Sequence, residues 1–445
     1  MQDVKLDRAL GLWSVVLFGL AYMTPMIVFG TFGPLATASQ GTTAMSYLLA
    51  SGAILLTALS YGVMSRVYPV AGSAYTYARR SLSSGVGFLV GWAVLLDYFF
   101  LPMVIWLIGA AYLSSAFPAV PSWVWILAFI FTTTVINILG IAFASRVNFV
   151  LMLVQLVVVV AFMLLAARYV AAANGTGGLA AAAPFFQANV PFSASVAGAA
   201  IAAYSFLGFD AVSTLTEETK DAGRTIPRAI LIVALAGGAI FVAAAYVVQL
   251  AHPGFEFASV DAAGNEIAQK IGGDFFVVIF LATLVLAQFS SGLAAQASVG
   301  RLLYAMGRDN VLPSGLFARL HPKWQTPLVN LLFVGLVGLA AIWMDVTTST
   351  SFINFGAFLA FTAVNLSVIA LYLRGHEGVR PLGALLGVIV PAIAAACDLY
   401  LLLNLDAHAK WLGLIWLALG AAYLAYLTRM FSQAPPEMDF VEETA

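Results

Sequence analysis

The stretch Leu-Ala-Tyr-Met-Thr-Pro-Met at 20–26 interrupts the first long apolar run, and Tyr-Ser-Phe-Leu-Gly-Phe-Asp at 204–210 interrupts a later one. Hydrocarbon offers no hydrogen-bond partners, so irregular backbone at membrane depth persists only where it is packed inside protein or lines a cavity. Each interruption alone is also compatible with a tolerated kink. Two broken helices at corresponding positions of two halves, with Asp210 beside the second break, predict the binding site of a transporter.

The composition is that of an integral membrane protein. Of 445 residues, 62% are hydrophobic and 9% are charged, whereas a soluble domain carries about 25% charged residues. A net charge of −1 gives no electrostatic basis for binding nucleic acid. The single cysteine, Cys397, cannot form an internal disulfide, and the four histidines show no metal-ligand spacing. We therefore expect a protein of the lipid bilayer with no metal or cofactor, and the sequence shows no catalytic constellation typical of an enzyme.

Apolar runs long enough to cross a bilayer recur along the chain. A transmembrane helix needs about 20 mainly apolar residues, and this criterion predicts an all-α integral membrane protein with twelve transmembrane helices. The expected helices begin near Leu10, Met45, Gly87, Val124, Val147, Val196, Ala229, Phe275, Leu328, Ser351, Leu382 and Trp411.

Positive charge sets the expected orientation, because Lys and Arg concentrate in cytoplasmic loops. With the N-terminus inside, sixteen of the 19 Lys and Arg residues fall in cytoplasmic segments. The other three, Arg168, Lys270 and Lys410, fall outside. Both termini are therefore predicted to be cytoplasmic, and the acidic segment 430–445 is expected to be a disordered cytoplasmic tail.

Three carboxylates lie inside the expected helices, where each costs at least about 2.5 kcal/mol on insertion scales. Asp97 lies near the middle of the third helix. It either faces the transport core or serves as a buried, hydrogen-bonded anchor. Asp210 follows the second break, where it either binds a cation or proton or ties the broken backbone together. Asp398 lies close to the outer end of the eleventh helix, and we expect it to reach the lipid headgroups.

Uncharged polar residues also occur at membrane depth. Gln155 lies in the middle of the fifth helix, and Ser290 and Ser291 lie in the eighth. The two serines either contribute to an ion or substrate site or pack helices against one another. The charged run 217–228, which begins with Glu217, is either a solvated face or a cytoplasmic latch that opens in the inward-facing state.

Three further segments resemble those of a known family. Tyr-Pro-Val-Ala-Gly-Ser-Ala-Tyr-Thr-Tyr at 68–77 is similar to the signature after helix 2 of the amino acid–polyamine–organocation superfamily. Residues 206–219 with 224–228 resemble its helix 6 signature, and 301–313 resembles the segment after helix 8. Within this superfamily, GLAYMTPM, VGWAVLLDYFFLPM and HPKWQTP look most like the bacterial putrescine importers.

The resemblance implies a five-plus-five inverted repeat with discontinuous helices 1 and 6. Helices 1 to 5 would occupy 9–168, helices 6 to 10 would occupy 195–374, helices 11 and 12 would occupy 380–429, and the tail would follow. Substrate would bind between the two breaks, with walls from helices 3, 8 and 10 and with Tyr204 at the aromatic gate position. The implied substrate-binding residues are Tyr22, Met23, Thr24, Pro25, Met26, Asp97, Tyr98, Tyr204, Ser205, Phe206, Leu207, Gly208 and Ser290.

Two departures from the family bear on coupling and substrate. Gln155 stands where several proton-coupled members have a lysine, so Asp97, Asp210 or Glu217 must carry the proton, or another ion drives transport. Gly30 stands where the putrescine importers carry an acidic residue, which weakens the case for a diamine.

The leading interpretation is a proton-coupled importer of a small amine or amino acid in the bacterial inner membrane, with putrescine as the best single substrate. Sodium coupling through Ser290 and Ser291 is less favoured. An amino acid exchanger on the same fold and a transport-dead amine sensor are the competing interpretations of the function.

Overall fold

The computed structural model shows an all-helical architecture, which confirms the predicted fold class. It describes residues 10–70, 73–139, 144–308, 311–324 and 326–436, with only the backbone at 144–150, 217, 305 and 308. These residues include eleven helices that are long and apolar enough to cross a membrane. The apolar helix Leu328–Trp343, which coincides with one predicted crossing, is shorter. The count of twelve crossings and the inverted repeat therefore stay predictions.

The helices follow the expected order along the chain. The long ones are α4 (Thr43–Val67), α6 (Ser84–Ala116), α7 (Ser122–Leu139), α8 (Ala144–Asn174), α10 (Ala222–Ala251), α11 (Ala263–Arg308), α14 (Val346–Leu373), α15 (Val390–Leu403) and α16 (Ala407–Leu427). The shorter ones include α5 (Ser73–Ser81), α13 (Leu328–Gly338), the 3-10 turns η4 (Val260–Ala262) and η5 (Leu339–Trp343), and the π-helical turn η7 (Leu385–Ile389). Gly273, with φ of 68°, interrupts α11 two residues before the start predicted from sequence.

The first broken helix consists of α1 (Leu12–Met23), α2 (Ile27–Gly30) and α3 (Phe32–Ala38). Thr24 adopts a left-handed conformation with φ of 53° and ψ of 88°, and Pro25 has no N–H with which to continue the helical ladder. The chain re-enters helix when the Ile27 N–H donates to the Thr24 carbonyl at 2.8 Å. The break thus arises from the chemistry of the Thr-Pro pair.

The second broken helix begins as α9 (Phe192–Ala202) and tightens into the 3-10 turn η2 (Ala203–Phe206). Leu207 is extended, with ψ of 127°, and Gly208 has φ of 115°, a conformation that residues with a Cβ rarely adopt. The chain then continues in the 3-10 helix η3 (Ala211–Glu218).

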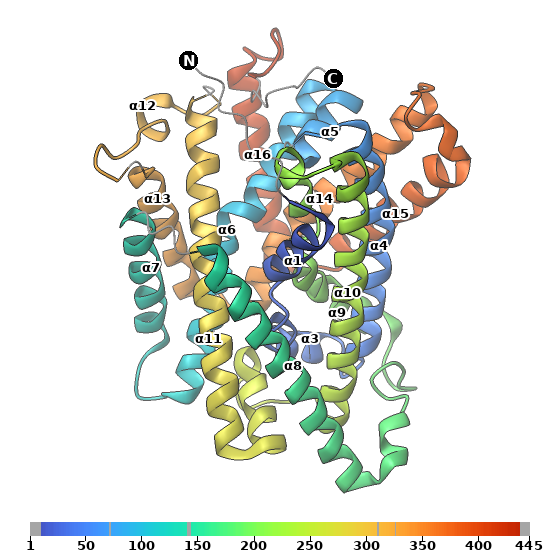
Figure 1. Ribbon diagram of the computed structural model, residues 1–445, viewed down its shortest axis with the longest axis vertical. Coiled ribbons are helices and arrows are strands. Elements are labelled where there is room, and N and C mark those ends of the chain that lie inside the picture. The colour runs from blue at the N-terminus through green and yellow to red at the C-terminus, as the bar shows by residue number, and fades with distance from the viewer. Residues whose placement is uncertain (1–9, 71–72, 140–143, 309–310, 325, 437–445) are drawn as a thin grey trace.

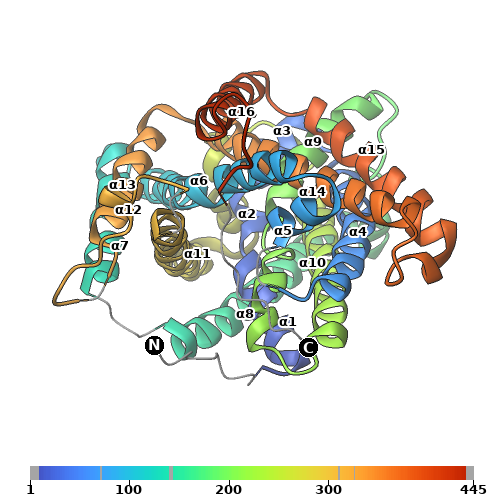
Figure 2. The same ribbon diagram turned by 90° about the horizontal axis from the view of Figure 1, so that it is seen from above.

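The broken helices lie among the long ones. Helix α4 packs along α10, α6 packs against α11 and α14, and α1 contacts α10 and η3. Figures 1 and 2 show α7 and α13 at one edge of the molecule and α15 at the opposite edge. Large apolar side chains such as Phe275 and Trp343 are about four-fifths exposed, as expected for a surface that faces lipid.

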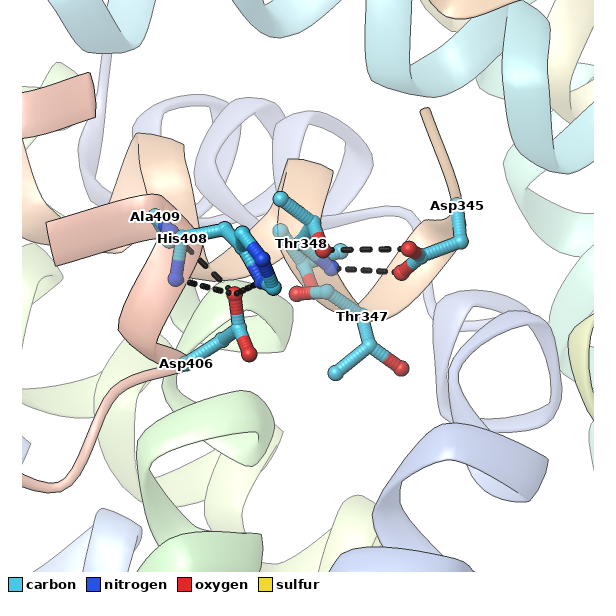
Figure 3. A network of polar contacts seen from close by, with 7 residues as sticks. Asp345, Thr347, Thr348, Asp406, His408 and Ala409 are labelled. Carbon is cyan, nitrogen blue, oxygen red and sulfur yellow. Dashed lines mark hydrogen bonds and ion pairs between the residues drawn. The ribbon is translucent and has the colours of Figure 1, made fainter. Parts of the chain in front are cut away.

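Two helices begin at aspartate caps that Figure 3 shows from close by. Asp345 accepts hydrogen bonds from the Thr348 N–H at 2.7 Å and from the Thr348 hydroxyl at 3.0 Å, at the start of α14. Asp406 accepts from the N–H groups of His408 and Ala409 at the start of α16. Such caps satisfy N–H groups that have no partner within the helix.

Candidate functional site

The two helix breaks are in contact with each other. A Cβ atom placed on Gly208 would lie 2.4 Å from Cδ1 of the Tyr22 ring, which therefore occupies the space beside the glycine. At the same level, Met23 packs on Gly237 of α10. The open backbone of both breaks is thus sheltered inside the protein, as sequence reasoning predicts. Their depth relative to the bilayer stays a prediction.

A small cavity of about 30 Å³ lies between the breaks. Tyr22, Met23 and Thr24 line it from the first break, and Tyr204 and Leu207 line it from the second. Leu101 and Ile105 of α6 and Gln288 and Ser291 of α11 complete the wall. Five of the residues predicted to bind substrate therefore surround one cavity.

A second cavity of about 110 Å³ continues from the first. The two share Tyr22, Thr24, Leu101 and Ser291, and the second adds Gln155 of α8. Gln155 is 6% exposed, and its Oε1 atom has no hydrogen-bond partner. Gln155 therefore lines a cavity together with Tyr22 and Thr24 of the first break.

Asp97 of α6 is buried beside the breaks. Its side chain is 8% exposed, and its Oδ1 atom has no hydrogen-bond partner. The carboxylate lies within electrostatic range of Asp210, Tyr22 and Tyr204. Leu101, one helical turn further along the same face, lines both cavities. Asp97 therefore carries one buried acceptor oxygen without a partner among the described residues, and it does not itself line the three cavities.

Asp210 has a local hydrogen-bond partner at the second break. Its Oδ1 atom accepts from the Gly208 N–H at 3.3 Å, and the side chain is 7% exposed. This bond supports the interpretation that Asp210 ties the broken backbone together. A role in coupling stays a prediction.

The remaining predicted site residues lie away from the small cavity. The Ser205 hydroxyl pairs with the Tyr47 hydroxyl at 2.9 Å, and the Phe206 ring packs edge-on against Phe241. Tyr98 lines a separate, third cavity. Ser291, rather than its neighbour Ser290, lines the cavities between the breaks. The side chain of Glu217 lies outside the described residues, whereas residues 218–228 of the same charged run are described. The latch stays a prediction.

The third cavity, of about 190 Å³, lies toward α5. Tyr75, Phe88, Trp92 and Tyr98 give it an aromatic lining, and it shares Ser298 of α11 with the second cavity. Ser291 and Ser298 are seven residues apart and so lie on one face of α11. The three cavities therefore follow α11 from the breaks toward the α5 end of the molecule.

The other end of the first broken helix is covered. A Cβ atom on Gly33 would lie 1.9 Å from the Val260 carbonyl oxygen, so only glycine allows this approach. The Thr37 hydroxyl donates to the Phe255 carbonyl at 3.1 Å, and the Phe32 and Phe257 rings are in contact. The segment between α10 and α11 thus packs over α3. The three cavities above lie toward α5, and a further cavity of about 240 Å³ lies at this segment, lined by Ser259, Ala262 and Asn265.

The prediction for Asp398 is wrong. Its side chain is fully buried rather than placed at the headgroups, and it contacts Thr57 of α4 and Asn365 of α14. Hydropathy along the chain gives the depth of a residue but not the neighbouring helices. In this case α4 and α14 cover the face of α15 that carries the carboxylate.

Comparisons with known proteins agree with this architecture. Residues 14–407 match the family model described as "Amino acid permease". The chain is 41% identical to the low-affinity putrescine importer PlaP of Escherichia coli, over 98% of this chain and 97% of the importer. It is 27% identical to the branched-chain amino acid permease BcaP of Bacillus subtilis, over 97% of this chain and 95% of the permease. It is also 26% identical to the methylthioribose transporter of Bacillus subtilis, over 95% and 94% of the two chains. The chain is thus a multi-pass membrane transporter rather than an enzyme, and it belongs to the amino acid permease family.

Proposed function

We propose that this protein imports a small organic amine, with putrescine as the leading substrate, by alternating access. The observation that carries the proposal is Asp97, a buried carboxylate with one unpartnered oxygen beside the two helix breaks. An ammonium group supplies both the positive charge and the N–H donors that this oxygen lacks.

The lining of the cavities favours an amine over an amino acid. Among the described residues, none that lines the three cavities along α11 is Lys, Arg or His. A substrate carboxylate would therefore have no cationic side chain as a partner. At the second break, the Gly208 N–H that could bind a carboxylate already donates to Asp210. The Gln288 amide is an unpartnered donor at the small cavity, but it is neutral, so a substrate carboxylate would lack a charged partner there.

A diamine has a second candidate partner in Gln155. Gln155 lines a cavity with Tyr22, and its Oε1 atom is buried without a partner among the described residues. The unpartnered Asp97 Oδ1 atom is also buried, and Asp97 lies within electrostatic range of Tyr22. Gly30, where an acidic residue is missing, is enclosed by Ile108, and Gln288 lies close to it. The two acceptors match the two amino groups of a diamine, and this pairing supports putrescine despite the missing carboxylate. The name of the putrescine importer at 41% identity points in the same direction.

The three cavities and the covered end support an inward-directed route. We propose twelve transmembrane helices in a five-plus-five repeat, with both termini in the cytoplasm of a bacterium and α5 on the cytoplasmic side. In this orientation the segment at Val260 closes the outer side, and the cavities lead from the breaks toward the cytoplasm. We further propose that a proton gradient drives import, with Asp97, Asp210 or Glu217 as candidate carriers and sodium as the less favoured ion.

Uptake into proteoliposomes tests this function. Labelled putrescine, propylamine and leucine are compared with and without an inward proton gradient, in sodium and in choline medium. We expect putrescine uptake that the proton gradient accelerates and that choline leaves unchanged. If leucine is taken up and neither putrescine nor propylamine is, the protein is an amino acid permease or exchanger instead. If uptake collapses in choline medium, the coupling ion is sodium rather than the proton.

A further inference from the structure

A fully buried polar cluster lies outside the cavities, where α15 meets α4 and α14. Asp398 of α15, Asn365 of α14 and Thr57 of α4 are each 0% exposed. The Thr57 hydroxyl donates to Asp398 Oδ2 at 2.9 Å, and the Asn365 amide donates to the same oxygen at 2.9 Å. The same amide also donates to the Thr57 hydroxyl oxygen at 3.0 Å.

Counting donors and acceptors shows that this cluster lacks one donor. A threonine hydroxyl carries one hydrogen and an asparagine amide carries two, and the three bonds above use all of them. Asp398 Oδ1 and Asn365 Oδ1 are buried acceptors without a hydrogen-bond partner. Buried acceptors are rarely left unpaired, so the cluster has room for one more hydrogen.

Among the described residues, no basic side chain is seen to act on Asp398, whose polar partners are Thr57 and Asn365. Asp398 faces α4, α14, η7 and α9, and the basic residues nearest to its partners in sequence, Arg66 and Arg374, are nine residues from Thr57 and Asn365. Nine residues of helix span about 13 Å, and Arg374 donates to the Ser81 carbonyl. Tyr61 and the adjacent Cys397 are two titratable groups within electrostatic range of Asp398. An unbalanced buried carboxylate is costly.

Tyr61 connects this cluster to the second break. Its ring is fully buried and packs edge-on against the Phe209 ring, with 5.5 Å between the ring centroids. It also lies within electrostatic range of both Asp210 and Asp398. Tyr61 is four residues from Thr57, so both lie on one face of α4. A change at the break can therefore reach the cluster through one side chain.

We propose that Asp398 is a proton-binding site separate from the substrate site, and that the coupled proton supplies the hydrogen that the cluster lacks. The proton is taken from water on one side of the membrane and returned to water on the other when α15 separates from α4 and α14. Asp398 then carries the coupled proton in place of Asp97, Asp210 or Glu217. Amine and proton occupy different carboxylates, Asp97 and Asp398, and can be carried together. This inference rests on the proposed proton-driven import.

The test compares exchange with accumulation in proteoliposomes containing Asp398→Asn. Asparagine keeps the size of the side chain and supplies an N–H in place of the added hydrogen, while its second N–H has no acceptor in the cluster. We expect exchange of labelled for unlabelled substrate to stay within about twofold of wild type. Accumulation driven by a proton gradient is expected to fall to the level of passive equilibration. Full gradient-driven accumulation by this variant would overturn the proposal.

A second variant keeps the test decisive if Asp398→Asn does not fold. Thr57→Val removes one donor to the carboxylate and keeps the carboxylate itself, so it should displace the midpoint of the pH profile of uptake. Thr43→Val, at a buried threonine of the same helix that donates to the Ala245 carbonyl, is the matched control and should leave the midpoint unchanged. An unchanged midpoint in Thr57→Val would contradict the proposal. Both tests use whichever labelled substrate the wild-type protein exchanges. They therefore test the proton site even if that substrate is not an amine.

Discussion

The ring of Tyr22 lies against Gly208, and this contact joins the break of the first helix to the break of the second. The Tyr22 Cδ1 atom lies 2.4 Å from where a Cβ would be on Gly208, and Gly208 itself has φ of 115°. Both the missing side chain and the unusual φ are therefore required for the two breaks to meet. The site depends on one glycine as much as on its polar groups.

We expect Gly208→Ala to abolish uptake and to lower stability by about 1–3 kcal/mol, because the backbone is strained for alanine and the Cβ collides with Tyr22. Uptake in proteoliposomes and thermal unfolding in detergent measure the two effects. Gly52→Ala is the control, since a Cβ there meets nothing within 4 Å and α4 continues through it. Wild-type uptake by Gly208→Ala would show that the contact is dispensable.

Asp97→Asn tests the partner of the ammonium group. Loss of a charged hydrogen bond costs about 1.5–3 kcal/mol, so the apparent KM for putrescine should rise about tenfold or more, while membrane insertion remains normal. Kinetics of putrescine uptake and the yield of folded protein are the measurements. Glu256→Gln, which removes an exposed carboxylate from the segment between α10 and α11, should behave like wild type. Unchanged kinetics in Asp97→Asn would remove Asp97 from the site.

Local chemistry explains why the breaks were predictable from sequence. Pro25 removes a backbone donor and Gly208 permits a positive φ. Both effects are local and do not depend on which helices lie beside them. The partners of Asp398 were not predictable, because they lie 341 and 33 residues away in the chain. Ser290 and Ser291 illustrate the same limit, since one residue turns a helix by about 100° and only packing shows that Ser291 faces the cavities.

Tyr204 lines the small cavity and is 5% exposed, which is the position expected of a lid over bound substrate. Tyr204→Phe keeps the aromatic face and should keep most transport. Tyr204→Ala opens the cavity and removes a π face that attracts ammonium, an interaction worth about 0.5–2 kcal/mol. The apparent KM should therefore rise severalfold in the alanine variant only. Equal kinetics for alanine and wild type would reduce Tyr204 to a packing residue.

Gln155 should set the preference for two amino groups over one. Its Oε1 atom has no partner among the described residues, so a second ammonium group gains a bond there that a monoamine does not use. Gln155→Leu should raise the apparent KM for putrescine about five- to tenfold, as loss of one hydrogen bond predicts, and should leave that for propylamine unchanged. Gln155→Glu keeps the acceptor and adds a negative charge, so it should favour putrescine further. Gln155→Lys places a cation beside the first break and should weaken both amines through repulsion. Competition of both amines against labelled putrescine measures this series, and an equal loss of both amines in Gln155→Leu would show that Gln155 shapes the cavity without recognising the second amino group.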